Sequence, residues 1–269
     1  MIVYLKIHDE GTNDMKYQTA WCTDVGIRKD TNQDSALLMQ AESVQGSVLF
    51  AVICDGMGGL AKGEVASASL IQRFRNWFVR EFPLLLQESA FSAALSQSWN
   101  RLIQEQNRAI ADYGQQFHVN LGTTVAALLL VGDNYYIINV GDSRVYLLSS
   151  QIYQLTHDQT VVQKEIDEGR LTPEQAASDP RSSVLLQCVG ASQVVAPEFL
   201  AGEVEHSTRF LLCCDGFRHE ISPQEMYETL SRSTAVTKQD MEQGLQYLVE
   251  LNKNRNEVDN ITALMIDVE

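Results

Sequence analysis

The sequence lacks the features that mark several large classes of protein. Its 269 residues contain no apolar run approaching the ~20 residues that a membrane-spanning helix needs. The longest apolar runs, residues 48–54 and 125–131, are only as long as a strand. Residues 1–16 lack a basic start followed by a long apolar stretch. We therefore expect no secretory signal, no membrane partner and a cytoplasmic location.

Cysteine and positive charge are also scarce. The five cysteines show no Cys-x-x-Cys spacing, and most lie inside apolar runs, where a free thiol behaves as a small buried hydrophobe. We expect structural thiols in a reducing compartment, without a disulfide framework or zinc site. Lysine and arginine number 20 against 35 acidic residues, which gives a formal charge of -15. Because nucleic-acid binders need basic patches, this balance argues against DNA or RNA as partners.

Breaks in the chain are few. The sequence has five prolines, no internal repeat and no low-complexity linker. Its 45% of apolar and 20% of charged residues suit a well-packed globular core. A single domain is therefore the preferred organisation.

The first half of the chain reads as strands followed by helices. Strand-like segments lie at residues 18–22, 35–39 and 48–54. Apolar residues at four-residue spacing then predict two amphipathic helices, over residues 66–78 and 91–110. Pro83 is expected to end the first of them.

Strands return in the second half. Strand-like segments lie at residues 123–131, 135–140 and 145–148, and turn residues between them predict a meander of hairpins. Residues 158–180 form a polar, partly helical excursion. Two more strands, at residues 210–214 and 261–268, flank a helix expected from about residue 223 to 251. This order predicts sheets covered by helices rather than a parallel doubly wound sheet.

Aspartates stand where four apolar strands begin or end. These residues are Asp55, Asp142, Asp215 and Asp259, and a glycine adjoins the first three. One Asp-Gly pair is commonly only a turn, but the repetition in an acidic chain indicates a shared oxygen-rich site. Crowded carboxylates raise one another's pKa values, and hard divalent cations relieve that conflict. The residues alone predict a multinuclear Mg²⁺ or Mn²⁺ site, with phosphoryl chemistry as one use, and leave the substrate open.

Seven short blocks carry a resemblance to a known family. In order they are Asn32-Gln33-Asp34, Asp55-Gly56-Met57-Gly58-Gly59 with Gly63-Glu64, Gly122-Thr123-Thr124, Val140-Gly141-Asp142-Ser143-Arg144, Leu155-Thr156-His157-Asp158, Cys214-Asp215-Gly216 and Asp259-Asn260-Ile261-Thr262. Together they resemble the bacterial PP2C (PPM) phosphatases over about residues 17–267. The resemblance implies an α+β fold, a four-layer α-β-β-α sandwich of two antiparallel sheets flanked by helix pairs. It also implies one domain over residues 17–269, a flap segment at about 156–180 and an N-terminal extension at 1–16.

The activity implied by this resemblance is hydrolysis of phosphoserine and phosphothreonine in proteins, with Mn²⁺ or Mg²⁺ as cofactor. Two ions would share one water, and the resulting hydroxide would attack phosphorus in line. The expected partners are phosphoproteins, the substrates of a serine/threonine kinase. We expect a monomer.

The resemblance also assigns roles to individual residues. The implied metal-binding residues are Asp55, Gly56, Asp142, Asp215 and Asp259. Asp55 would bridge two ions, one of which the Gly56 carbonyl also binds. Asp142 and Asp215 would hold the third ion described for bacterial members. Asp34 would hold metal-bound water, so the implied catalytic residues are Asp34, Asp55 and Lys29.

Four positions depart from the family pattern. Lys29 stands where the family has an arginine that grips the substrate phosphate; we expect Lys29 to bind it more weakly, with the adjacent Arg28 as an alternative. Leu60 replaces a histidine found in many bacterial members. His219 and Gln33 replace an aspartate and a glutamate, and we expect both to form hydrogen bonds around the metal ligands.

These departures leave competing functions open. One is a pseudophosphatase, a metal-stabilised module that binds phosphoproteins or a kinase with little turnover. Another is a phosphatase for small molecules or for an anti-sigma-type regulator. The intact aspartates favour the active protein phosphatase.

Overall fold

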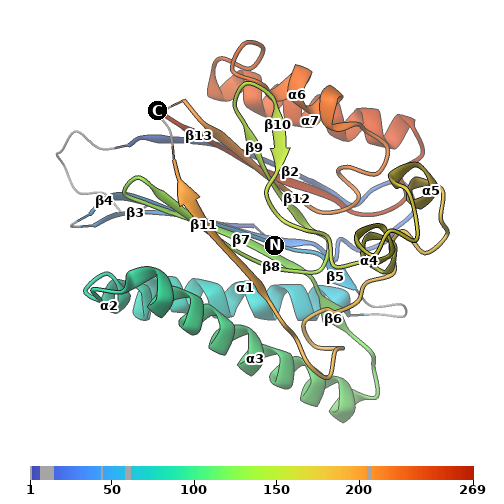
Figure 1. Ribbon diagram of the computed structural model, residues 1–269, viewed down its shortest axis with the longest axis horizontal. Coiled ribbons are helices and arrows are strands. Elements are labelled where there is room, and N and C mark those ends of the chain that lie inside the picture. The colour runs from blue at the N-terminus through green and yellow to red at the C-terminus, as the bar shows by residue number, and fades with distance from the viewer. Residues whose placement is uncertain (1, 7–14, 44, 58–61, 205–206) are drawn as a thin grey trace.

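The chain folds into four layers, with helices on both outer sides of two stacked sheets (Figure 1). The computed structural model describes residues 2–6, 15–43, 45–57, 62–204 and 207–269. The predicted α-β-β-α sandwich is confirmed. Of the helices that the structure describes, none is long and apolar enough to cross a membrane.

One sheet has six strands in the order β1-β3-β4-β7-β8-β11. Their bounds are β1 Ile2–Lys6, β3 Ser35–Ser43, β4 Gly46–Cys54, β7 Val125–Val131, β8 Asn134–Val140 and β11 Glu198–Glu203. Neighbouring strands are antiparallel except for β1, which pairs in parallel with β3. The sheet is therefore antiparallel apart from this one pair at its edge. A hairpin would force antiparallel pairing, but β2 of the other sheet intervenes between β1 and β3.

The second sheet has five strands in the order β10-β9-β12-β13-β2, all antiparallel. Their bounds are β2 Tyr17–Asp24, β9 Arg144–Leu148, β10 Ile152–Gln154, β12 Arg209–Cys213 and β13 Ile261–Val268. The expected single meander is wrong, because the hairpins β7–β8 and β9–β10 lie in different sheets. Between them Gly141, with φ of 100°, carries the chain from one sheet to the other. The predicted strand 123–131 is likewise divided, into β6 (Gly122–Thr123), which pairs with β5 (Gly56–Met57), and β7.

Helices α1 (Gly63–Arg80), α2 (Phe82–Leu85) and α3 (Phe91–Phe117) cover the six-stranded sheet (Figure 1). Helix α1 ends at Arg80, and Pro83 lies in the first turn of α2, where its missing N–H has no helical acceptor to lose. Helices α6 (Pro223–Leu230) and α7 (Lys238–Asn254) cover the other sheet. The single helix expected there is therefore two, because Thr237 starts α7 with a capping box.

The central strands β4 and β7 of the six-stranded sheet are buried on both faces, which explains their long apolar runs. Along β4, Leu49, Ala51 and Ile53 pack with residues of the second sheet, whereas Phe50 packs under the helices. The Phe50 ring lies 6.0 Å from that of Trp99 on α3. All five cysteines are free and buried, as predicted. A rigid, apolar strand therefore runs directly up to Asp55.

Candidate active site

Strand register brings the predicted aspartates to one end of the sandwich. Ser35, the first residue of β3, pairs with Cys54, the last residue of β4. Asp34, which precedes β3, and Asp55, which follows β4, therefore lie beside each other. The backbone of Asp55 is fixed by Thr124, whose hydroxyl accepts a hydrogen bond from the Asp55 amide at 3.0 Å and whose amide donates to the Asp55 carbonyl at 2.9 Å.

The second sheet delivers its aspartates to the same end. Strands β12 and β13 are antiparallel, with Cys213 opposite Ala263, so Asp215 follows one strand where Asp259 precedes the other. Gly216 permits the close approach of these two segments, because a Cβ at this position would lie 2.2 Å from the Asn260 carbonyl oxygen. Asp142 follows β8 at the crossing between the sheets.

Asp34 is a buried carboxylate and Asp55 a half-buried one, and both lie near other carboxylates. Burial raises the pKa of Asp34 to about 7, and the charge of Asp215 adds to that effect. Burial, with the charges of Asp215 and Asp34, raises the pKa of Asp55 well above its usual range. A divalent cation among these carboxylates would favour their ionised forms.

Gly56 and Gln33 form a tight backbone junction beside these carboxylates. A Cβ on Gly56 would lie 2.4 Å from the Gly63 carbonyl oxygen, so only glycine fits. With its side-chain amide oriented to satisfy both neighbours, Gln33 donates to the Gly56 carbonyl and accepts from the Gly63 amide, each at 3.2 Å. Gln33 therefore forms its hydrogen bonds beside the Gly56 carbonyl. Leu60 lies outside the described residues.

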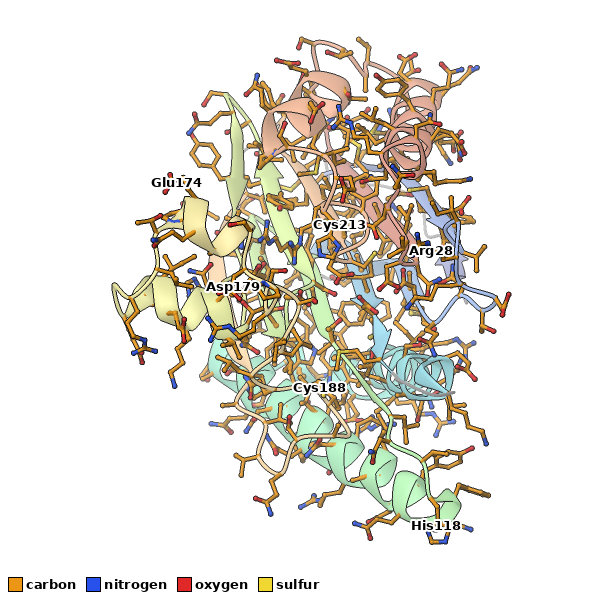
Figure 2. The ribbon with its side chains drawn as sticks, turned by 90° about the vertical axis from the view of Figure 1, so that its right-hand side faces the viewer. Arg28, His118, Glu174, Asp179, Cys188 and Cys213 are labelled. Atoms are coloured by element: carbon orange, nitrogen blue, oxygen red, sulfur yellow. The ribbon has the colours of Figure 1, made fainter. Side chains whose placement is uncertain are left out.

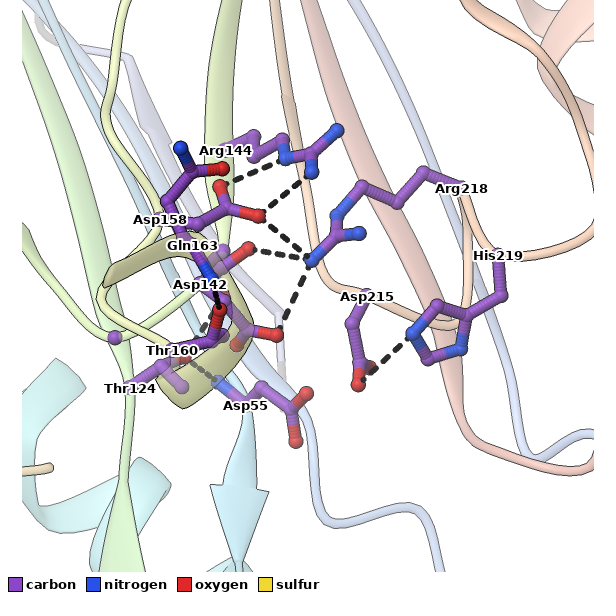
Figure 3. A network of polar contacts seen from close by, with 12 residues as sticks. Asp55, Thr124, Asp142, Arg144, Asp158, Thr160, Gln163, Asp215, Arg218 and His219 are labelled. Atoms are coloured by element: carbon purple, nitrogen blue, oxygen red, sulfur yellow. Dashed lines mark hydrogen bonds and ion pairs between the residues drawn. The ribbon is translucent and has the colours of Figure 1, made fainter. Parts of the chain in front are cut away.

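On the opposite side of the site, arginines neutralise the carboxylates (Figure 3). Arg144 forms two hydrogen bonds with Asp158, at 2.8 and 2.6 Å. Arg218 Nη2 lies 3.1 Å from Asp142 Oδ2 and 3.6 Å from Asp158 Oδ2. Burial and the charge of Asp215 nevertheless raise the pKa of Asp142 to about 7. No role was assigned to Arg218 from the sequence. Its position, two residues after the pair Asp215-Gly216 at the end of β12, is nevertheless visible in the sequence as a cation close to the predicted metal ligands.

His219 connects Asp215 to a second buried acid. Its Nε2 lies 3.5 Å from Asp215 Oδ2, and its Nδ1 lies 3.3 Å from Glu257 Oε2. Burial would lower the pKa of His219, but Glu257 and Asp215 raise it above the usual value. Burial would raise the pKa of Asp215, but the charges of His219 and Arg218 outweigh it and lower that pKa. Glu257 was missed from the sequence because it lies in no recognised block.

Lys29 faces the site, whereas Arg28 does not pair with a described acid. Lys29 Nζ lies 2.9 Å from Asp259 Oδ1, and the two side chains are 40% and 35% exposed. Partial burial would lower the pKa of Lys29, but the hydrogen bond to Asp259 and the nearby acidic charges raise it. Arg28 is exposed, and in Figure 2 it lies across the strand ends from the flap residues Glu174 and Asp179. The flap contains α4 (Val161–Asp167) and α5 (Pro173–Ala177).

The donor set fits a hard divalent cation in its chemistry. All its side-chain donors are carboxylate oxygens, and Asp215 Oδ1 is buried without a hydrogen bond from a described N–H or O–H group. Within the described part of the chain, no three His, Cys, Asp or Glu side chains are gathered as a ready metal site. Asp259 pairs with Lys29 instead of joining the other aspartates. The Asp259 side chain must therefore rotate to bind a metal ion.

Comparison with known proteins identifies the family of this chain. Residues 27–251 match the family model described as "Protein phosphatase 2C". The chain belongs to the protein phosphatase 2C family. The serine/threonine phosphatase Stp of Listeria monocytogenes is 31% identical over 250 residues, which cover 91% of this chain and 93% of Stp. PstP of Mycobacterium tuberculosis is 30% identical over 249 residues, and the chain spans only 44% of its length.

Solved structures of PP2C phosphatases share the fold. The serine/threonine phosphatase of S. agalactiae superposes with a TM-score of 0.79 at 28% identity, covering 94% of this chain and 100% of that one. The PstP catalytic domain, solved in complex with two manganese ions, superposes with a TM-score of 0.74 at 28% identity. It covers 94% of this chain and 99% of the PstP domain.

Proposed function

We propose that this chain is a metal-dependent protein phosphatase that hydrolyses phosphoserine and phosphothreonine esters in proteins. The observation that carries the proposal is the meeting of Asp34, Asp55, Asp215 and Asp259 from four strand ends of two sheets. The named relatives are serine/threonine phosphatases. They give no support to the pseudophosphatase alternative.

Two manganese ions would be held by Asp55, the Gly56 carbonyl, Asp215 and Asp259. When bound, they would lower the pKa of a coordinated water and neutralise charge on the phosphoryl group. The protein holds Asp55 in place through Thr124 and the Gly56 carbonyl through Gln33. We assign to Asp34 the positioning of the attacking water.

Lys29 is the proposed phosphate-binding residue. Its ammonium group already reaches the site and pairs with Asp259 at 2.9 Å. A metal ion bound by Asp259 would release Lys29 to attract the substrate phosphate, as a point charge rather than a bidentate fork. Arg28, exposed on the same loop, is the alternative contact for the phosphoprotein.

The test is Mn²⁺-dependent hydrolysis of a phosphothreonine peptide by the wild type and by Asp55→Asn. The substitution and a chelator should each lower kcat by at least about 10²–10³-fold, the loss expected when the groups that stabilise transition-state charge are removed. Asp133→Asn is the matched control, because Asp133 is exposed in the β7–β8 turn at the opposite end of the sheet.

Two outcomes contradict the proposal in different ways. Turnover that survives the chelator, or full turnover by Asp55→Asn, rules out the metal mechanism. Metal binding by the wild type without turnover of the peptide or of an aryl phosphate supports the pseudophosphatase instead.

A further inference from the structure

The carboxylate expected to hold a third metal ion already has a cation beside it. Arg218 Nη2 donates to Asp142 Oδ2 at 3.1 Å and to the Asp142 carbonyl oxygen at 3.0 Å. The Arg218 and Asp142 side chains are only 10% and 5% exposed. Figure 3 shows the guanidinium group lying between Asp142 and Asp158. This ion pair is therefore part of the buried structure and not a mobile surface contact.

Hydrogen bonds hold both the backbone of Arg218 and the Asp158 carboxylate that lies near its guanidinium group. The Arg218 amide donates to the Asp215 carbonyl at 2.9 Å, so the residue belongs to the turn that also presents Asp215. At the other end, Asp158 is held by two hydrogen bonds from Arg144. When both aspartates are ionised, the two negative charges of Asp142 and Asp158 are matched by the two positive charges of Arg144 and Arg218. The ionised group is then neutral without an added ion.

A divalent cation on the same Asp142 oxygen would be repelled. Since a metal–oxygen bond of this kind is about 2.1 Å long, the ion would lie at most about 5 Å from Arg218 Nη2. Like charges at that separation in a buried site repel strongly, because little water screens them.

We propose that Arg218 takes the place of a third metal ion, so that this chain forms a two-metal centre with a built-in cation beside Asp142. The inference rests on the proposed two-metal function and corrects the third ion implied by the family resemblance. Arg218 acts on the centre through Asp142 and is a positioning residue. Its guanidinium group would hold the Asp142 carboxyl group in place at any metal concentration.

The test is the number of Mn²⁺ ions bound at saturation, measured by electron paramagnetic resonance of the free ion. The wild type should bind two ions, and so should Arg218→Lys, which keeps the charge. Arg218→Gln should gain a third ion, bound at least about tenfold more tightly than any further ion on the wild type, because a neighbouring like charge has been removed. Arg232→Gln is the matched control, since Arg232 pairs with Asp267 rather than with any residue of the site.

A second test compares the wild type with Asp142→Asn and does not depend on the folding of the Arg218 variants. Asp142→Asn in the presence of Arg218 should leave the count of bound ions unchanged. Three ions on the wild type, with one lost in Asp142→Asn, would overturn the inference while leaving the phosphatase proposal intact. No bound ion on the wild type would overturn the proposed function and this inference together.

Discussion

Two groups of buried aspartates meet in this site, and the protein treats them differently. The crowded carboxylates, Asp34 and Asp55, lie beside other acids and have strongly raised pKa values. The paired carboxylates, Asp142 and Asp158, lie at similar depth but contact Arg218 and Arg144. Burying a charge requires compensation in either case. The paired group finds it within the chain, whereas the crowded group needs an ion from solution.

The difference separates structural from functional electrostatics. A permanent ion pair supports the fold at any metal concentration. A cluster of like charges destabilises the protein under chelation and creates affinity for a divalent cation. Removing one carboxylate from each group should therefore have opposite effects on stability.

The largest expected effect is on the stability of the chelated protein. Asp158→Asn should lower the free energy of unfolding by about 3 kcal/mol, because it leaves the Arg144 guanidinium with a weakened partner. Asp55→Asn should raise it by about 1–2 kcal/mol, because it removes a repelled charge. Urea denaturation at pH 8 with a chelator measures both. A loss of stability in both variants would remove the distinction between the two groups.

The pH dependence of stability tests a property that Asp34 and Asp142 share across the two groups. The pKa values of Asp34 and Asp142 are about 7 in the folded protein, against an ordinary value of 3.8. Both groups therefore bind protons more tightly when folded, and the stability that this supplies at low pH is lost as the pH rises through about 7. The free energy of unfolding of the chelated protein should fall between about pH 5 and pH 8.

The control for this pH effect is the Mn²⁺-loaded protein. Its stability should fall less over the same range, because the ions stabilise the ionised carboxylates. The variant Asp34→Asn should show a shallower fall than the wild type under chelation. A chelated protein that gains stability with rising pH would contradict the assignment of the crowded group.

The smallest expected effect concerns Lys29, the cation exposed at the edge of the crowded group. Lys29→Arg should lower KM for a phosphothreonine peptide by up to about tenfold, since a guanidinium group adds a charge-assisted hydrogen bond to phosphate. The free energy of unfolding should change by less than about 1 kcal/mol, because the ion pair with Asp259 is largely exposed. Lys238→Arg, on the surface of α7, is the control. An unchanged KM would separate Lys29 from the phosphate.

Much of this molecule could be predicted from local sequence patterns. Helices α1 and α3 carry strong periodic signals because one face of each is buried, and strands β4 and β13 read as apolar runs because both faces are buried. The aspartates at strand ends could be predicted for the same reason, since an apolar strand that stops at a carboxylate is visible in the sequence.

Contacts between distant segments could not be predicted in this way. Arg218 and Asp142 are 76 residues apart and meet only because the chain crosses between sheets at Gly141. The pairing of His219 with Glu257 likewise depends on how the α7–β13 connection folds back on β12. Family resemblance gave Asp142 a third metal ion, but it carries no information about a cation supplied by a residue outside the shared blocks.

The most direct measurement is an anomalous-scattering map, at the manganese edge, of crystals grown with Mn²⁺. If Arg218 takes the place of a third metal ion, the map should show two manganese peaks among Asp55, Asp215 and Asp259, and no peak between Asp142 and Arg218. An empty map at Asp55, or a manganese ion seated against Asp142, would contradict this prediction.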